Sequence, residues 1–139
     1  MDESSMITYI TEQFADVETV NSFGYMFFFY RDERKLPFAT LLAADYPYDH
    51  VSHLDRPGVY RLNIGVSKQT FQALFGSDPV DSRGYDFTAL DTLMPHPDYA
   101  AQSFVCVLNP GHETLIQVQS LLAEAYALAV RRYARRARP

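Results

Sequence analysis

The sequence predicts a single α+β domain, with a curved antiparallel sheet, an N-terminal helix, a middle helix and a long C-terminal helix. Three observations lead to this fold class. The chain has 139 residues, of which 47% are hydrophobic and 21% charged, which suits one domain with its own core. Apolar residues follow a helical period near both ends and strand-like patterns between them. The connections are short, which favours antiparallel pairing with helices packed on one face of the sheet.

Helical spacing marks the start of the chain, and a strand pair follows it. Four apolar residues recur at spacings of 3, 4 and 3, the period of one helical face: Ile7, Ile10, Phe14 and Val17. Asp2 or Ser4 can cap this helix. The aromatic run 26–30 predicts a strand, residues 31–34 a charged turn, and residues 36–43 a returning strand.

The middle of the chain predicts a strand followed by a helix. Residues 45–58 form an irregular segment, and residues 59–66 alternate as in a strand. One face of this strand carries the apolar side chains of Tyr60, Leu62, Ile64 and Val66. The opposite face carries Arg61 and Asn63. Ser67 is placed to cap the next helix, and Gly76 to end it.

The remaining elements complete one domain. The pattern predicts one or two helical turns near residues 90–94, a strand over 103–108 and a final helix over about 113–134. Without a repeat or a linker in the sequence, we assign residues 1–134 to a single domain and residues 135–139 to a basic tail.

Composition excludes several classes of protein. The single cysteine, Cys106, excludes an internal disulfide. The apolar runs are far shorter than the ~18 residues needed to cross a bilayer. The first residues lack the basic and apolar regions of a signal peptide. We therefore expect a soluble, cytoplasmic protein without a membrane partner.

The charge is distributed unevenly along the chain. Residues 1–130 hold 7 basic and all 17 acidic residues, a net charge of −10, whereas residues 131–139 hold five arginines. An acidic body repels phosphates, so only the tail could attract nucleic acid. We expect no nucleic-acid partner beyond weak binding through this tail.

Arg61 and Asn63 form the first candidate site. Both side chains project from the same face of the predicted strand, about 6–7 Å apart by the rise of a strand. If the sheet curves around a pocket, a guanidinium and an amide there can bind a carboxylate or phosphate. The alternative is a solvated face on which Arg61 pairs with a neighbouring acidic residue.

A second candidate site contains His96, Tyr99 and Gln102, with His53 on a neighbouring loop. Prolines on both sides of His96 stiffen its segment, as a binding loop requires. His96 can serve as a general base near neutral pH. The alternative is a surface loop in which Tyr99 packs on the sheet and Gln102 bonds to backbone.

The sequence predicts no metal site and no cofactor. His50 and His53 lie near three aspartates, but their spacing matches no established ligand pattern. Cys106 stands between valines, as a small core residue does. The chain has neither a complete phosphate-binding loop nor a hydrolase nucleophile elbow.

Four stretches carry a resemblance to a known group: residues 36–41, 54–66 (LDRPGVYRLNIGV), 93–102 (LMPHPDYAAQ) and 105–110. Together they resemble an uncharacterised bacterial domain family of about this length. The order of elements is also similar, more weakly, to the MmcQ/YjbR group of small α+β proteins, some of which carry a DNA-binding label. The resemblance implies the fold and supplies no catalytic motif.

Three functions remain open at this stage. The first is a non-enzymatic binding module for a small anionic ligand or a protein, with the site where Arg61 and Asn63 meet His53 and the segment 96–102. The second is an enzyme with His96 as general base. The third is weak nucleic-acid binding through the arginine tail. The aromatic run 25–30 would supply a homodimer contact if one half of it were exposed.

Overall fold

The computed structural model describes residues 1–136, which form three α-helices, two short 3-10 helices and one sheet. The α-helices are α1 (Glu3–Gln13), α2 (Lys68–Phe75) and α3 (His112–Arg136). The 3-10 helices are η1 (Ser82–Gly84) and η2 (Ala100–Gln102). The strands are β1 (Val17–Ser22), β2 (Tyr25–Tyr30), β3 (Ala39–Leu42), β4 (Arg61–Gly65), β5 (Met94–Pro95) and β6 (Phe104–Leu108).

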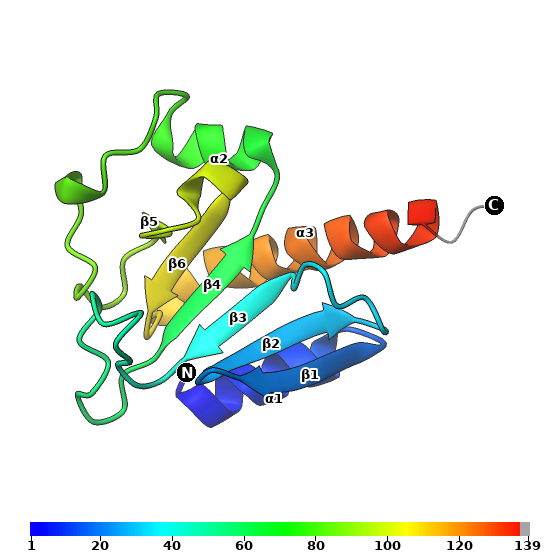
Figure 1. Ribbon diagram of the computed structural model, residues 1–139, viewed down its shortest axis with the longest axis horizontal. Helices are drawn as coiled ribbons and strands as arrows, with labels where there is room; N and C mark the ends of the chain where they lie inside the picture. Colours follow the sequence, from blue (N-terminus) through cyan, green and yellow to red (C-terminus); the bar gives the residue numbers. More distant parts are fainter. Residues whose placement is uncertain (137–139) are drawn as a thin grey trace.

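The six strands form one open antiparallel sheet in the order β1-β2-β3-β4-β6-β5, which confirms the α+β class predicted from the sequence. Helices α1 and α3 cover one face of this sheet (Figure 1). The main core lies between these two helices and the sheet. It includes Leu62 and Ile64 of β4 with Val118 and Leu122 of α3. Burial of this apolar area is the main term that stabilises the fold.

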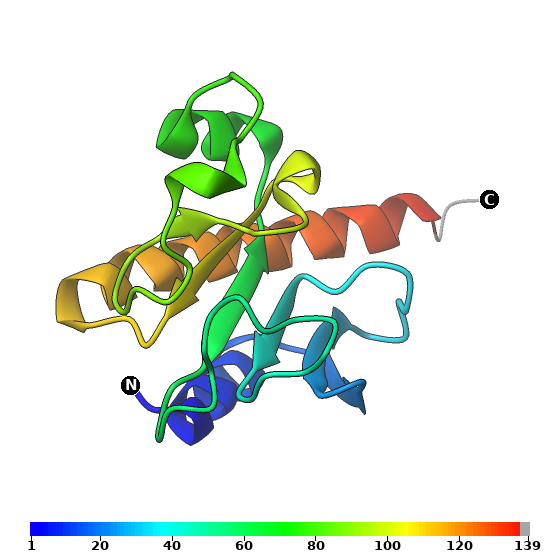
Figure 2. The ribbon, with the colours of Figure 1, turned by 60° about the vertical axis from the view of Figure 1, so that its left-hand side comes forward.

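Loops cover part of the other face of the sheet. The segments 43–60 and 76–103 pass over this side of the molecule (Figure 2). Beneath them lies a second, smaller apolar cluster: Leu42, Leu54, Phe87, Met94, Cys106 and Leu108. Arg61 and Asn63 share this face, so the alternation predicted for β4 is confirmed.

Local signals in the sequence position the helix ends. Asp2 caps α1 by accepting from the backbone N–H of Ser5 at 2.8 Å. Ser67 caps α2 by accepting from Thr70 N–H, and Gly76 ends that helix with φ 88°. Helix α3 continues to Arg136, two residues beyond the predicted end, so part of the basic tail is helical. Residues 137–139 of that tail lie outside the described residues.

Two local predictions are wrong. Val17 does not belong to the first helix: α1 ends at Gln13, and Val17 begins β1, a strand the helical spacing concealed. The signal for it is the two-residue turn Phe23-Gly24, which joins β1 to β2. Residues 90–94 form no helix, because Met94 pairs with Cys106 as the edge strand β5.

No helix within residues 1–136 is both long and apolar enough to span a membrane.

Candidate functional site

The Arg61 side chain is fully buried, with 0% exposed, on the sheet face opposite α1 and α3. Its guanidinium donates from Nη1 to Asp49 Oδ1 at 3.1 Å and to Ser52 Oγ at 3.0 Å. Nη2 donates to Asp49 Oδ2 at 2.5 Å, and Nε donates to Asn63 Oδ1 at 3.0 Å. Because Asp49 and Ser52 belong to the segment 43–60, the guanidinium ties this loop to the sheet.

The network extends across the next two strands of the sheet, β3 and β2. Asn63 Nδ2 donates to Thr40 Oγ1 of β3 at 2.9 Å, and the hydroxyl of Tyr25 on β2 donates to Asp49. Burial alone would raise the pKa of Asp49, but hydrogen bonds from Arg61 and Tyr25 hold it below its usual range. The carboxylate is therefore ionised at neutral pH, and the pair is charged on both sides.

This arrangement corrects the role that the sequence suggests for Arg61 and Asn63. The two side chains do share the predicted face, but they lie beneath a loop and satisfy each other and Asp49. Breaking a buried ion pair leaves an uncompensated charge, which is strongly unfavourable. We conclude that Arg61 and Asn63 form a structural anchor between the sheet and the loop 43–60.

His96 is also buried, with 4% exposed, but one of its ring nitrogens stays free. Nδ1 accepts the backbone N–H groups of Asp98 and Tyr99, each at 3.0 Å. A nitrogen that accepts two hydrogen bonds carries no proton, so the neutral ring holds its proton on Nε2. The ring is thus fixed as a hydrogen-bond donor through Nε2–H.

The environment of His96 keeps the ring neutral. Burial, followed by the nearby positive charge of Arg61, lowers the pKa of His96 to about 3, while Asp49 acts in the opposite direction. A general base near neutral pH needs a free lone pair and a pKa near the working pH. His96 has neither, since its lone pair is held by two N–H groups. The structure therefore gives no support to a general-base role for His96.

A cavity of about 500 Å³ lies beside His96, between α2, the loop after it and the segment that follows β5. Its walls are Lys68, Phe71, Gln72, Gly76, Ser77, Asp78, Pro79, Val80, Ser82, His96, Pro97, Asp98, Ala100, Ala101 and Ser103. We call it the α2 cavity. Its volume falls within the range of about 300–1,000 Å³ that small-molecule sites occupy.

His96 lines this cavity, and its second ring nitrogen, Nε2, has no protein partner. No protein acceptor bonds to Nε2, yet no buried side-chain nitrogen in residues 1–136 lacks a hydrogen-bond partner. Nε2–H therefore reaches solvent, although the ring as a whole is buried. The walls of the cavity combine His96 with Lys68, three serines, and the apolar Phe71 and Val80.

The other predicted site residues are only partly brought together. The Tyr99 ring lies 5.0 Å from the His96 ring, centroid to centroid, but its side chain is exposed. Gln102 is exposed on η2 beside the α2 cavity and is not among its walls. His53 is exposed on the loop 43–60 and is not among the walls of the α2 cavity. Of the residues predicted for this second site, only His96 lines the α2 cavity.

Sequence reasoning missed Lys68 and the loop 76–82. Lys68 is the first residue of α2, and nothing in its local sequence indicates that a loop ten residues later closes over it. Ser77 lies in the loop after α2 and Ser82 begins η1, and no sequence pattern marks either as the wall of a cavity. Such contacts depend on tertiary structure and have no periodic signal.

Cys106 is a buried core residue, as its neighbouring valines indicate. Burial raises the pKa of its thiol to about 12, so the reactive thiolate is absent at neutral pH. Within the described residues, no three His, Cys, Asp or Glu side chains are grouped to hold a metal ion. His50 and His53, near their aspartates, form no such group.

Comparison with known proteins supports the family but not a function. No curated protein and no solved structure matches the chain. The weaker likeness to the MmcQ/YjbR group receives no support. The predicted membership of an uncharacterised domain family is confirmed: residues 1–138 match DUF6194, a family of unknown function, and the chain belongs to that family.

Proposed function

We propose that this domain is a non-enzymatic module that binds a small molecule in the α2 cavity. The proposal is carried by one observation: a buried, neutral histidine whose Nε2–H has no protein acceptor lines a cavity of ligand size. Because no protein group accepts from this Nε2–H, it can donate to a ligand. A ligand that accepts from it would complete the hydrogen bonding of the ring.

The walls indicate what the ligand carries. His96 Nε2–H requires an acceptor oxygen, and Lys68 favours one with negative charge. Asp78 and Asp98 also line the cavity and disfavour a strongly anionic group such as a phosphate. Phe71 and Val80 favour an apolar body. We therefore propose a compact, largely apolar compound with a carbonyl or carboxylate group, which narrows the anionic ligand expected from the sequence.

The first test uses three probes that share one ring: benzoate, benzamide and benzylamine. Fragments of this size bind weakly, so a dissociation constant of about 1 mM is expected. At about 10 mM such a probe raises the free energy of unfolding by about 1.4 kcal/mol. We expect benzoate and benzamide to raise the melting temperature, and benzylamine, which offers His96 no acceptor, to leave it unchanged.

A matched pair of variants shows whether the probes bind in the α2 cavity. Ala101 is an exposed cavity wall, and Ala123 is equally exposed on α3 away from the cavity. Ala101→Phe should block the cavity and abolish the shift, while Ala123→Phe should retain it. If all three probes bind equally to the native chain, or if Ala101→Phe responds as Ala123→Phe does, the proposed site is wrong.

A further inference from the structure

The hairpin between β1 and β2 ends in an unusual residue. Phe23 and Gly24 form its two-residue turn, with φ of 53° and 83°. Turns of this kind favour Asn-Gly, because both central residues adopt positive φ. Phe23 is also 79% exposed, the largest exposed fraction among the large hydrophobic residues of the described chain. Neither the backbone nor solvation favours phenylalanine here, so a contact outside this chain is the simplest reason for it.

Neighbouring aromatic residues hold the turn rigid. The rings of Tyr46 and Tyr48 stack with centroids 5.6 Å apart, and the Tyr48 hydroxyl donates to the carbonyl of Phe23. A Cβ on Gly24 would come within 2.3 Å of the Tyr46 ring, so the turn and the loop 43–60 are in close contact. Tyr48 is itself 56% exposed. Phe23 is therefore a pre-organised projection rather than a loose loop tip.

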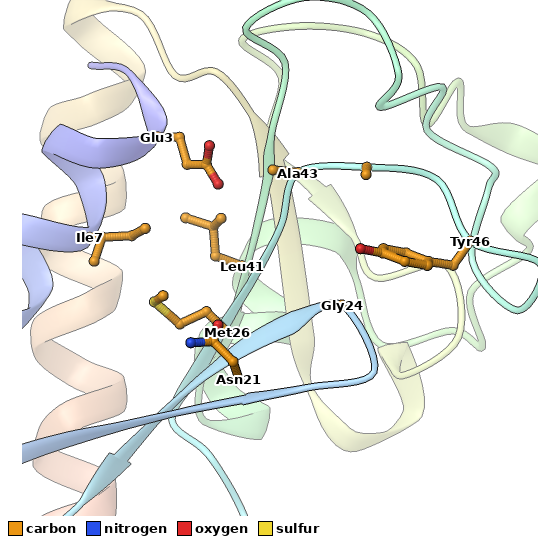
Figure 3. Close-up of a pocket in the computed structure, with 9 residues that line it drawn as sticks. Glu3, Ile7, Asn21, Gly24, Met26, Leu41, Ala43 and Tyr46 are labelled. Atoms are coloured by element: carbon orange, nitrogen blue, oxygen red, sulfur yellow. The ribbon is translucent and has the colours of Figure 1, made fainter.

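A cavity of about 230 Å³ lies directly beside this projection and shares Gly24 and Tyr46 with it. Figure 3 shows the apolar side chains of Ile7, Met26 and Leu41 on one side of it and Tyr46 across from them, and the polar side chains of Glu3 and Asn21 line it as well. We call it the hairpin cavity. It is smaller than most small-molecule sites, but an apolar cavity of about 150 Å³ is known to accept benzene, so one phenyl ring fits.

We propose that two copies of this chain pair through their hairpins, with Phe23 of each inserted in the hairpin cavity of the other. The projection and the cavity lie next to each other on one surface. A single twofold axis between two copies can therefore seat both rings at once, which is how self-complementary dimers are built. Of the aromatic run 25–30, Phe28, Phe29 and Tyr30 are buried, whereas Met26 lines the hairpin cavity.

The size and charge of this contact set its strength. Complete burial of an aromatic side chain removes ~150–250 Å² from solvent, so Phe23 and Tyr48 from both copies bury at most about 600–1,000 Å², less than stable specific interfaces bury. Each chain carries a net charge of −5, so the copies repel each other. The dimer is therefore weak, and added salt strengthens it by screening that repulsion.

Analytical ultracentrifugation of the full chain tests the pairing from about 10 μM to about 1 mM. The average mass should rise from 15.9 kDa towards twice that value, and rise further with added salt. Phe23→Asn suits the turn and removes the ring, so we expect a folded monomer with dimer affinity at least tenfold lower. Ala44→Leu fills the hairpin cavity from the other side and should have the same effect.

Leu36→Asn is the control, because Leu36 is also exposed but lies outside both the hairpin and its cavity. This variant should dimerise as the native chain does. A native chain that stays at 15.9 kDa throughout, or a dimer that survives Phe23→Asn, would overturn the proposal. Association that is lost equally in Leu36→Asn would show non-specific contact and overturn it as well.

Discussion

Replacement of Arg61 by methionine should lower the free energy of unfolding by about 3–5 kcal/mol, the usual cost of leaving one member of a buried ion pair alone. The substitution removes the guanidinium from Asp49, whose carboxylate then keeps only the Tyr25 hydroxyl as a side-chain donor. The loop 43–60 loses its anchor to the sheet at the same time. Urea unfolding at neutral pH, with the midpoint and slope compared between variants, measures the change.

A second replacement separates the charge from the packing. In Asp49→Leu/Arg61→Met both charges are gone, and apolar side chains fill the space, so most of the lost stability should return. Arg56→Met serves as the control, because Arg56 bonds only to backbone carbonyls on the same face and is exposed. If Arg61→Met costs no more than Arg56→Met, the anchor we describe does not stabilise the fold.

Acidification should destabilise the native chain through His96. Its ordinary pKa is about 6.5, and burial with the charge of Arg61 lowers it to about 3 in the folded state. Between these values the unfolded state binds the proton and the folded state does not, so stability falls as pH falls. The stabilisation is complete above about pH 6.5, and about 3 kcal/mol of it is lost by about pH 4.5.

His96→Asn isolates this effect from other acidic groups. An asparagine oxygen can accept the same two backbone N–H groups, as in an Asx turn, but it does not titrate. The loss between about pH 7.5 and about pH 4.5 should be about 3 kcal/mol smaller in the variant than in the native chain. Equal losses in both would mean that His96 titrates normally in the folded state.

The elements that position the site follow from local signals, but the partners of each side chain do not. The alternation in residues 59–66 predicts that Arg61 faces away from Leu62. It cannot show that Asp49, twelve residues earlier, returns to pair with it. The alternative considered from the sequence, in which Arg61 pairs with an acidic residue, agrees with the structure in the type of partner. The pair is buried because the loop 43–60 covers it, and the sequence of this loop has no periodic pattern that would predict its position.

The same limit applies to His96 and to the hairpin. Prolines around His96 predict a stiff segment, but they do not predict which ring nitrogen carries the proton, because two backbone N–H groups decide this. The strand β1 was hidden because Val17 continues the spacing of Phe14, while Asp16 adopts a positive φ and breaks the helix. Phe23-Gly24 marks a turn only once its flanking strands are known.

Long-range ¹H–¹⁵N spectroscopy of the His96 side chain, recorded with and without benzoate, tests the central claim most directly. We predict a neutral ring with its proton on Nε2 throughout the range above about pH 4, and a downfield shift of that proton as benzoate is added. A proton found on Nδ1, a titration near pH 6.5, or an Nε2–H signal that benzoate leaves unmoved would contradict the account.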